Sequence, residues 1–160
     1  GGLPPTTQTH RSIGGSGFYN LYETRDGRFI ALTGREMKFA KALLTALGRE
    51  ELIPLAEAEP GPIQQQLIGE LRQMFKTRDF DDWCAFLPTV EVSWAPVLDM
   101  AEGFDHPHAA AREMLVDDGI GGRGVGTPVK FADEPGEVHL RAPTLDADGA
   151  TIRASGWARG

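Results

Sequence analysis

The chain of 160 residues is 41% hydrophobic and 24% charged, a composition typical of one globular domain and not of a disordered or fibrous protein. Its formal net charge of −7 disfavours nonspecific nucleic-acid binding, because a surface that follows phosphates carries an excess of basic residues. No apolar run approaches the roughly 20 residues of a transmembrane helix, and we expect a cytoplasmic protein that binds neither nucleic acid nor membrane. Cys84 is the only cysteine, which excludes an intrachain disulfide and a cysteine-based zinc cage.

The N-terminal residues 1–17 are rich in Gly, Pro, Thr and Ser without periodicity, and we interpret them as a linker ending in a glycine-rich GGSG loop. The chain starts without a methionine, so we expect a fragment or a processed chain. Two alternating apolar runs, Phe18–Glu23 and Arg28–Thr33, then flank Asp26-Gly27, a pair that supplies the positive φ angles of a tight turn. These runs predict a β-hairpin.

Helical spacing of apolar residues predicts three helices, over residues 36–47, 62–77 and 80–87. Gly48 ends the first helix, and Asp79 is expected to cap the start of the third. The expected apolar face of the second helix consists of Ile63, Leu67, Leu71, Met74 and Phe75.

The C-terminal half predicts shorter elements. The β-rich run Val92–Leu98 contains a proline, which suits an edge strand. Residues 100–113 predict two short helices broken at His106-Pro107, and residues 114–116 predict a strand before a loop or hairpin tip at 117–127. Beyond Val129 no strong period remains.

The order of these elements predicts an α+β fold, a small antiparallel sheet with helices packed on one side. We divide the chain into a linker and loop (1–17), a small α+β domain (18–132) and a tail (133–160) that packs on something else.

Three clusters of functional residue types have simpler structural interpretations. The GGSG loop precedes a strand, whereas nucleotide loops lead into a helix, so a hinge or a mobile lid remains, and composition favours the hinge. Asp105, His106 and His108 lack metal-ligand spacing and a third ligand, so we predict no metal and expect His106 or Asp105 to cap the following helix. Asp81 and Asp82 fall in a first helical turn, where acids interact favourably with the helix dipole.

Glu36 is a candidate functional residue because of its position in the chain. It begins a helix, which alone favours a structural role, but it follows the hairpin through the short link Thr33-Gly34-Arg35. Functional groups often collect at such strand-to-helix junctions.

Three stretches agree in order and spacing with a known family: GGSGFYNLYETRDGRFIALTGREMKF, FKTRDFDDWCAFL and VEVSWAPVLDMAEGFDHPHAAAREM. Over residues 12–132 the chain resembles the smaller domain and following segment of the class III coenzyme A transferase family, most of all its α-methylacyl-CoA racemase branch. The matching positions are Gly14, Gly15, Phe18, Tyr19, Tyr22, Thr24, Asp26, Gly27, Glu36, Phe39, Trp83, Ala95 to Leu98, and Asp105 to Arg112.

The resemblance implies that Glu36 lines an active site as a catalytic residue, and that Gly14, Gly15, Gly17 and Tyr19 bind substrate, with the glycine loop closing as a lid. It implies an acyl-CoA thioester as substrate, with no further cofactor. It also implies two partners, the large domain of the same enzyme, which carries the principal catalytic groups and lies outside this chain, and a second subunit in an interlocked homodimer.

The resulting hypothesis is the C-terminal part of a 2-methylacyl-CoA racemase, inactive as an isolated chain. Two alternatives stay open: CoA transfer between carboxylic acids, and a noncatalytic module that binds a separate large-domain chain.

Overall fold

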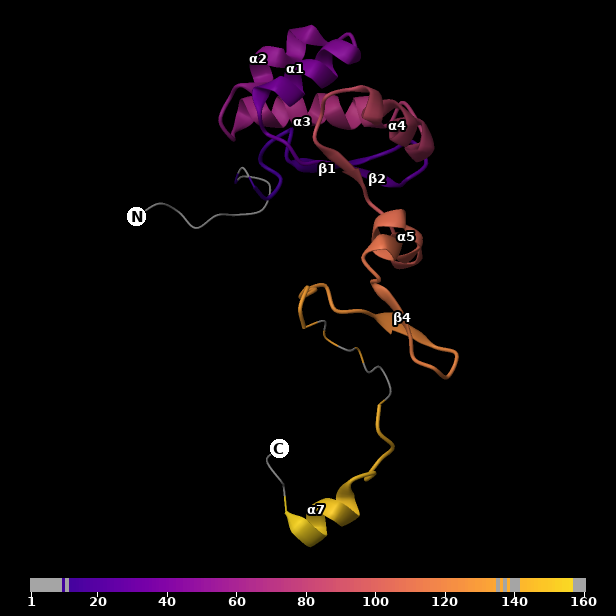
Figure 1. Ribbon diagram of the computed structural model, residues 1–160. Helices are drawn as coiled ribbons and strands as arrows, with labels where there is room; N and C mark the ends of the chain where they lie inside the picture. Colours follow the sequence, from indigo (N-terminus) through magenta and orange to yellow (C-terminus); the bar gives the residue numbers. More distant parts are fainter. Residues whose placement is uncertain (1–9, 11, 135, 137, 139–141, 157–160) are drawn as a thin grey trace, which may run out of the picture. The chain divides into compact units, whose positions relative to one another are not determined.

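The computed structural model describes residue 10, residues 12–134, residues 136 and 138, and residues 142–156. The chain forms two compact units, Gly1–Val97 and Leu98–Gly160, and each is described by itself. The first contains a three-stranded antiparallel sheet in the order β1-β2-β3 (Figure 1), with strands β1 (Asn20–Glu23), β2 (Phe29–Leu32) and β3 (Trp94–Pro96). The predicted hairpin and the predicted proline-containing edge strand are therefore both confirmed.

The turn of this hairpin differs from the prediction in one detail. The N–H of Thr24 donates to the carbonyl of Arg28 at 2.8 Å, and the N–H of Gly27 donates to the carbonyl of Thr24 at 3.1 Å. Gly27 has the positive φ angle, 81°, that the turn needs, but Asp26 does not. One left-handed residue is sufficient because the loop is longer than a two-residue turn.

The first unit contains four α-helices and two 3₁₀ turns among its described residues, and α3 is the longest helix. They are α1 (Met37–Ala46), the 3₁₀ turn η1 (Glu50–Leu52), α2 (Ile53–Ala56), α3 (Pro62–Phe75), α4 (Phe80–Phe86) and the 3₁₀ turn η2 (Leu87–Thr89). The three predicted helices are confirmed, whereas α2 has too few residues to show a period. The expected apolar face of α3 is wrong at Ile63, which is 51% exposed, because the buried stripe begins instead at Gln64, which is 3% exposed.

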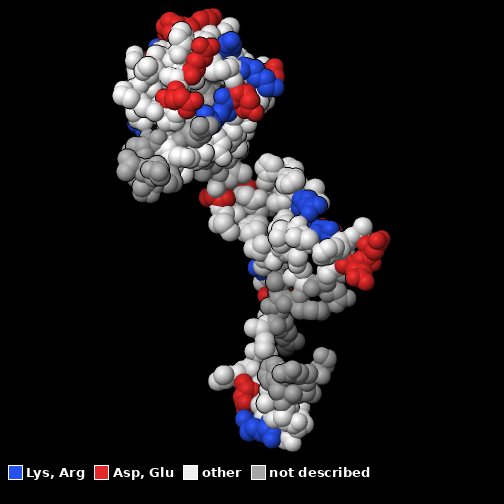
Figure 2. Space-filling model, turned by 90° about the vertical axis from the view of Figure 1, so that its left-hand side faces the viewer, with Lys and Arg blue, Asp and Glu red and all other residues white. Residues whose placement is uncertain are grey.

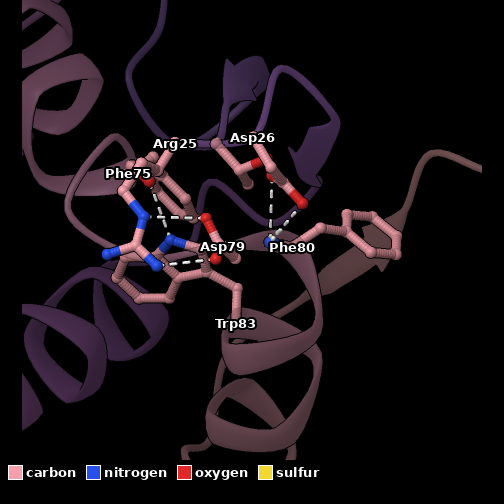
Figure 3. Close-up of polar contacts among 7 residues, drawn as sticks. Arg25, Asp26, Phe75, Asp79, Phe80 and Trp83 are labelled. Carbon is pink, nitrogen blue, oxygen red and sulfur yellow. Dashed lines mark hydrogen bonds and ion pairs between the residues drawn. The ribbon is translucent and has the colours of Figure 1, made fainter.

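The aromatic part of the core lies between α3, α4 and one face of the sheet, and α1 adds Ala40, Leu43 and Leu44 to the core. Tyr22 stacks on Phe75 with ring centroids 4.9 Å apart, and Phe75 meets Trp83 at 4.6 Å. The indole N–H of Trp83 donates to the carbonyl of Phe75 at 2.8 Å (Figure 3), so the end of α3 and the middle of α4 are joined by both packing and a hydrogen bond. The predicted α+β fold, with helices on one side of a small antiparallel sheet, is confirmed (Figure 1).

The start of α4 is organised by the hairpin turn and not by its own N-cap residue. Asp79 makes no capping hydrogen bond; its carboxylate instead binds Arg25 through two bonds of 2.8 and 2.6 Å (Figure 3). The N–H of Phe80 donates to both carboxylate oxygens of Asp26, at 3.2 and 3.3 Å. The prediction that Asp79 caps this helix is therefore wrong, because a residue 54 positions away provides the cap.

The other face of the sheet is mostly apolar. Alternation along the strands places Glu23, which forms an ion pair with Lys76, on this face. The same alternation places five apolar residues there, Leu21, Phe29, Ala31, Ala95 and Val97, of which Leu21 is 56% exposed. We call these five residues the outer face. Figure 2 shows acidic and basic side chains side by side on one view of the first unit, with no broad basic patch among the described side chains there.

The second unit is built from short elements, α5 (Met100–Asp105), α6 (Pro107–Ala111), β4 (Leu115–Asp117), β5 (Arg123–Val125) and α7 (Gly149–Ser155). The helix break at His106-Pro107 and the hairpin around 117–127 are confirmed. Helix α7 was not predicted. Among the described residues of this unit no large apolar side chain is fully buried, although several are half-buried.

None of the described helices is long and apolar enough to cross a membrane.

Candidate functional site

The junction between β2 and α1 is held by close backbone packing. The N–H of Thr33 donates to the carbonyl of Ser93 at 2.9 Å, and the two hydroxyl groups lie 2.8 Å apart. A Cβ atom added to Gly34 would overlap the ring of Phe39 and lie 2.6 Å from the Cβ of Ser93. Gly34 is therefore required for this close approach, which sets the direction in which the chain enters α1.

Glu36 occupies the N-cap position of α1, with extended backbone angles of −64° and 133°. Its carbonyl accepts the first turn's hydrogen bond from Phe39 at 3.0 Å, but its side chain makes no capping bond and is exposed. The long glutamate side chain is poorly suited to the N-cap, where Ser, Thr, Asp and Asn are preferred. The carboxylate is thus not occupied in closing the helix, although it remains near the positive end of the helix dipole.

The glycine-rich segment forms a compact turn before β1. Gly14 has a φ of 93° and is half-buried, and its carbonyl accepts a bond from the Asn20 amide at 3.2 Å. The N–H of Gly15, which is buried, donates to the carbonyl of His10 at 3.0 Å, and Tyr19 pairs with Ser16 in an isolated bridge. Whether this segment acts as a hinge or as a lid stays a prediction.

Gly17 is bound by the core on three sides. Its N–H donates to the Gln64 side-chain oxygen at 2.9 Å, and its carbonyl accepts from the Tyr22 hydroxyl at 2.6 Å. A Cβ at this position would lie 2.9 Å from the Leu67 side chain. Burial raises the pKa of Tyr22, so this hydroxyl stays a donor through the neutral range.

The candidate residues and their neighbours line two different cavities. An open trough of about 440 Å³ lies beside the outer face, and Gly14 and Tyr19 both line it. A smaller cavity of about 230 Å³ is lined by Ser16, Arg35, Met37 and Gln64, among others.

The structure therefore brings Gly14 and Tyr19 together at the trough, whereas Gly15 and Gly17 are buried. Glu36 lies in the chain between two residues that line the smaller cavity, Arg35 and Met37, but does not itself line either cavity.

Gln64 and the hydroxyl of Tyr22 were not predicted as parts of the site. A signal for Gln64 was present, because it shares helical spacing with Leu67, Ile68 and Leu71 and thus belongs to the buried stripe of α3. No local signal identifies its partners, which come from other segments.

The remaining candidates agree with their structural interpretations. His106 caps α6, its Nδ1 accepting from the His108 N–H at 3.1 Å, and no group of three or more His, Cys, Asp or Glu side chains among the described residues could hold a metal ion. Asp81 and Asp82 lie in the first turn of α4. Burial raises the pKa of the half-buried Cys84 thiol, which lowers its reactivity.

Comparison with known proteins identifies a family. Residues 2–149 match the model of CoA-transferase family III. The chain is 30% identical to the alpha-methylacyl-CoA racemase of Mus musculus over 108 residues, which are 66% of this chain and 28% of that protein. It is 29% identical to the acetyl-CoA:oxalate CoA-transferase of Acetobacter aceti over 145 residues, 84% of this chain and 36% of that one.

The same relationship is visible in three dimensions. A CAIB/BAIF family protein from Brucella suis superposes with a TM-score of 0.66 at 28% sequence identity, covering 85% of this chain and 36% of that structure. The chain therefore spans about one third of the length of these relatives. Because a racemase and a transferase match at nearly equal identity, these comparisons resolve the family but not the racemase branch.

Proposed function

Because the chain belongs to CoA-transferase family III, we propose that it is the small-domain part of an enzyme that acts on acyl-CoA thioesters. The reaction we propose is racemisation of a 2-methylacyl-CoA. The C–H bond at the α-carbon breaks, the proton passes to a base, and the electron pair forms an enolate with the thioester carbonyl. Return of a proton to the opposite face gives the other stereoisomer, and no further cofactor takes part.

The placement of Glu36 is the observation that carries this proposal. Its carboxylate is exposed and makes no capping bond, at a junction held by the contacts of Gly34 with Phe39 and Ser93. An exposed carboxylate on a fixed backbone junction can take part in proton transfer or orient the group that does, and such acid–base catalysis contributes roughly 10² to 10⁴ in rate. Gly14 and Tyr19, which share the trough, are the proposed substrate contacts of the segment, with Gly15 and Gly17 behind them.

The outer face supports the proposal that another part of the enzyme packs on this unit. An exposed apolar patch of this kind marks an interaction surface, and the relatives are about three times as long as this chain. We place the large domain of the same enzyme against it, in an interlocked homodimer, with residues 18–132 as the small domain and residues 133–160 returning to the large domain. The isolated chain is then inactive, because the principal catalytic groups lie in the large domain.

CoA transfer between carboxylic acids is the second candidate. It is favoured by the longer match to the acetyl-CoA:oxalate CoA-transferase, which covers 84% of this chain. In that reaction no α-proton is removed, and Glu36 is a helix-start carboxylate. A noncatalytic module binding a separate large-domain chain is the remaining alternative.

Deuterium exchange at the α-carbon separates these functions. The full-length protein is incubated with a 2-methylacyl-CoA in heavy water, as wild type, as Glu36→Gln, and as Glu50→Gln, a control at another exposed glutamate that starts a helical turn. Racemisation predicts exchange that Glu36→Gln slows by roughly 10² to 10⁴ and Glu50→Gln leaves unchanged. Movement of CoA between acids without exchange would establish the transferase, and neither reaction from the full-length protein would favour the noncatalytic module.

A further inference from the structure

Gln64 connects two segments that are distant from each other in sequence. Its side-chain oxygen accepts from the N–H of Gly17 at 2.9 Å, across 47 positions. Its side-chain nitrogen lies 3.2, 3.3 and 2.8 Å from the carbonyl oxygens of Leu55 and Ala56, which end α2, and of Ala58, which follows α2. We call this stretch, the end of α2 and the residues after it, the 55–58 connection. One amide therefore joins the glycine-rich segment to this connection.

The burial of Gln64 makes these bonds costly to lose. The side chain is 3% exposed, and the described structure contains no buried side-chain nitrogen or oxygen without a hydrogen-bond partner. An amide presents an acceptor and two donors, and here the acceptor faces an N–H while the donors face carbonyls. Leucine cannot make these bonds, and glutamate can make only those to the acceptor side, because an ionised carboxylate has no proton to donate.

The consequence for the glycine-rich segment is that its two ends differ. At Gly17 the N–H, the carbonyl and the Cα are all in contact with the core, through Gln64, Tyr22 and Leu67. Gly14 lies at the other end, half-buried, in a backbone conformation that favours glycine. Movement of Gly17 would therefore break several core contacts.

Gln64 also lies next to the junction that carries Glu36. It lines the smaller cavity together with Ser16 from the glycine-rich segment and with Arg35 and Met37, the neighbours of Glu36. A displaced Gln64 amide would therefore change the lining of a cavity that the glycine-rich segment shares with the residues on either side of Glu36. Misplacement of reacting groups by about 1 Å can cost 10²-fold in rate.

We propose that Gln64 is a positioning residue: its amide holds Gly17 against the 55–58 connection and thereby fixes the glycine-rich segment relative to the residues on either side of Glu36. The role in turnover rests on the proposed acyl-CoA reaction, whereas the fixed position of Gly17 does not.

The test compares Gln64→Glu with Gln66→Glu, which makes the same chemical change at an exposed position of the same helix. In the full-length protein, amide hydrogen exchange at Gly17 is measured together with kcat and KM for the acyl-CoA reaction. We expect Gln64→Glu at pH 8 to speed Gly17 exchange at least 10-fold and to lower kcat about 10-fold with less than a 3-fold change in KM, and Gln66→Glu to change neither. At pH 5, protonation of the new carboxyl restores one donor, so part of both losses is recovered.

Three results would overturn the proposal. Unchanged exchange at Gly17 in Gln64→Glu would show that the amide does not hold this residue, and equally faster exchange throughout α3 and the sheet would show general destabilisation only. A normal kcat with faster Gly17 exchange would refute the positioning role. Failure of the proposed function is distinguishable, because wild-type protein would then lack the acyl-CoA reaction while the exchange measurement still reports on Gly17.

Discussion

The hydrogen bond from the Tyr22 hydroxyl to the Gly17 carbonyl provides a stability prediction that the structure defines closely. The bond is 2.6 Å long, and Tyr22 has no exposed surface. Tyr22→Phe removes only the hydroxyl and leaves the stacking on Phe75, at 4.9 Å, in place, so no large cavity forms. The Gly17 carbonyl then loses its partner in the interior, and an unsatisfied buried acceptor costs about 1–3 kcal/mol. We expect the free energy of unfolding to fall by that amount.

Urea unfolding followed by tryptophan fluorescence measures this loss as a lower midpoint with an unchanged m-value. Tyr19→Phe is the matched control, because it removes the same hydroxyl from a side chain that is 42% exposed, and surface changes of this kind stay within about 0.5 kcal/mol. If the two substitutions had equal effects, or if Tyr22→Phe had none, the bond from Tyr22 to Gly17 would not stabilise the folded protein as argued.

The same side chain predicts a loss of stability at alkaline pH. Burial raises the pKa of Tyr22 in the folded protein above its ordinary value of 10.0. Above about pH 10 the unfolded chain therefore releases the tyrosine proton while the folded chain keeps it, and stability falls as pH rises. This contribution is absent from Tyr22→Phe. Similar slopes for the two proteins between pH 9 and pH 11 would contradict the argument.

Three further predictions concern other parts of the first unit. Hydrogen bonds from the Thr24 hydroxyl and from the Phe80 N–H hold the pKa of Asp26 below its ordinary value. Asp26→Asn should therefore lower the urea midpoint at pH 7 and reduce the loss of stability as pH falls below about 4. Equal midpoints of the wild type and the variant at pH 7 would contradict this prediction. Gly34→Ala should cost about 1–3 kcal/mol through overpacking, whereas Gly69→Ala, where a Cβ meets nothing within 4 Å, should be neutral or stabilising in thermal unfolding. Leu21→Lys should leave the unfolding midpoint of the 160-residue chain unchanged, because Leu21 is exposed there. In the full-length protein the same substitution should weaken association, measured by sedimentation. Unaltered association would show that the outer face is not a docking surface.

Local pattern was sufficient to predict most elements and the His106 cap of α6, but not the cap of α4. The periods that predicted α1, α3 and α4 come from residues within each helix, and most buried residues of these helices follow those periods, whereas Ile63 is exposed. Asp79 precedes α4 and is of the right type to cap it, but Arg25 binds its carboxylate. Such a competition between distant residues leaves no trace in the local sequence.

In the candidate site, too, local sequence features could be predicted and contacts between distant residues could not. A glutamate at a strand-to-helix junction could be recognised from the sequence, and its exposure and its lack of a capping bond follow from a structure. Gln64 could not be assigned, because a glutamine in a helix is ordinarily exposed, and its burial is stabilised only by partners at Gly17 and in the 55–58 connection. Reading the buried stripe strictly by period, without excluding polar residues, would have included it.

Helix α3 is the common support of the segments that were predicted separately. Its first turn holds Gly17 through Gln64, its last turn stacks Phe75 on Tyr22, and the Phe75 carbonyl accepts from Trp83 of α4. The direction of the chain at Glu36, in contrast, depends on the contacts of Gly34 outside α3. Substitutions in α3 should therefore act first on the glycine-rich segment, and substitutions at Gly34 first on Glu36. For this reason the tests of Gln64 and of Glu36 probe separate parts of the proposed site.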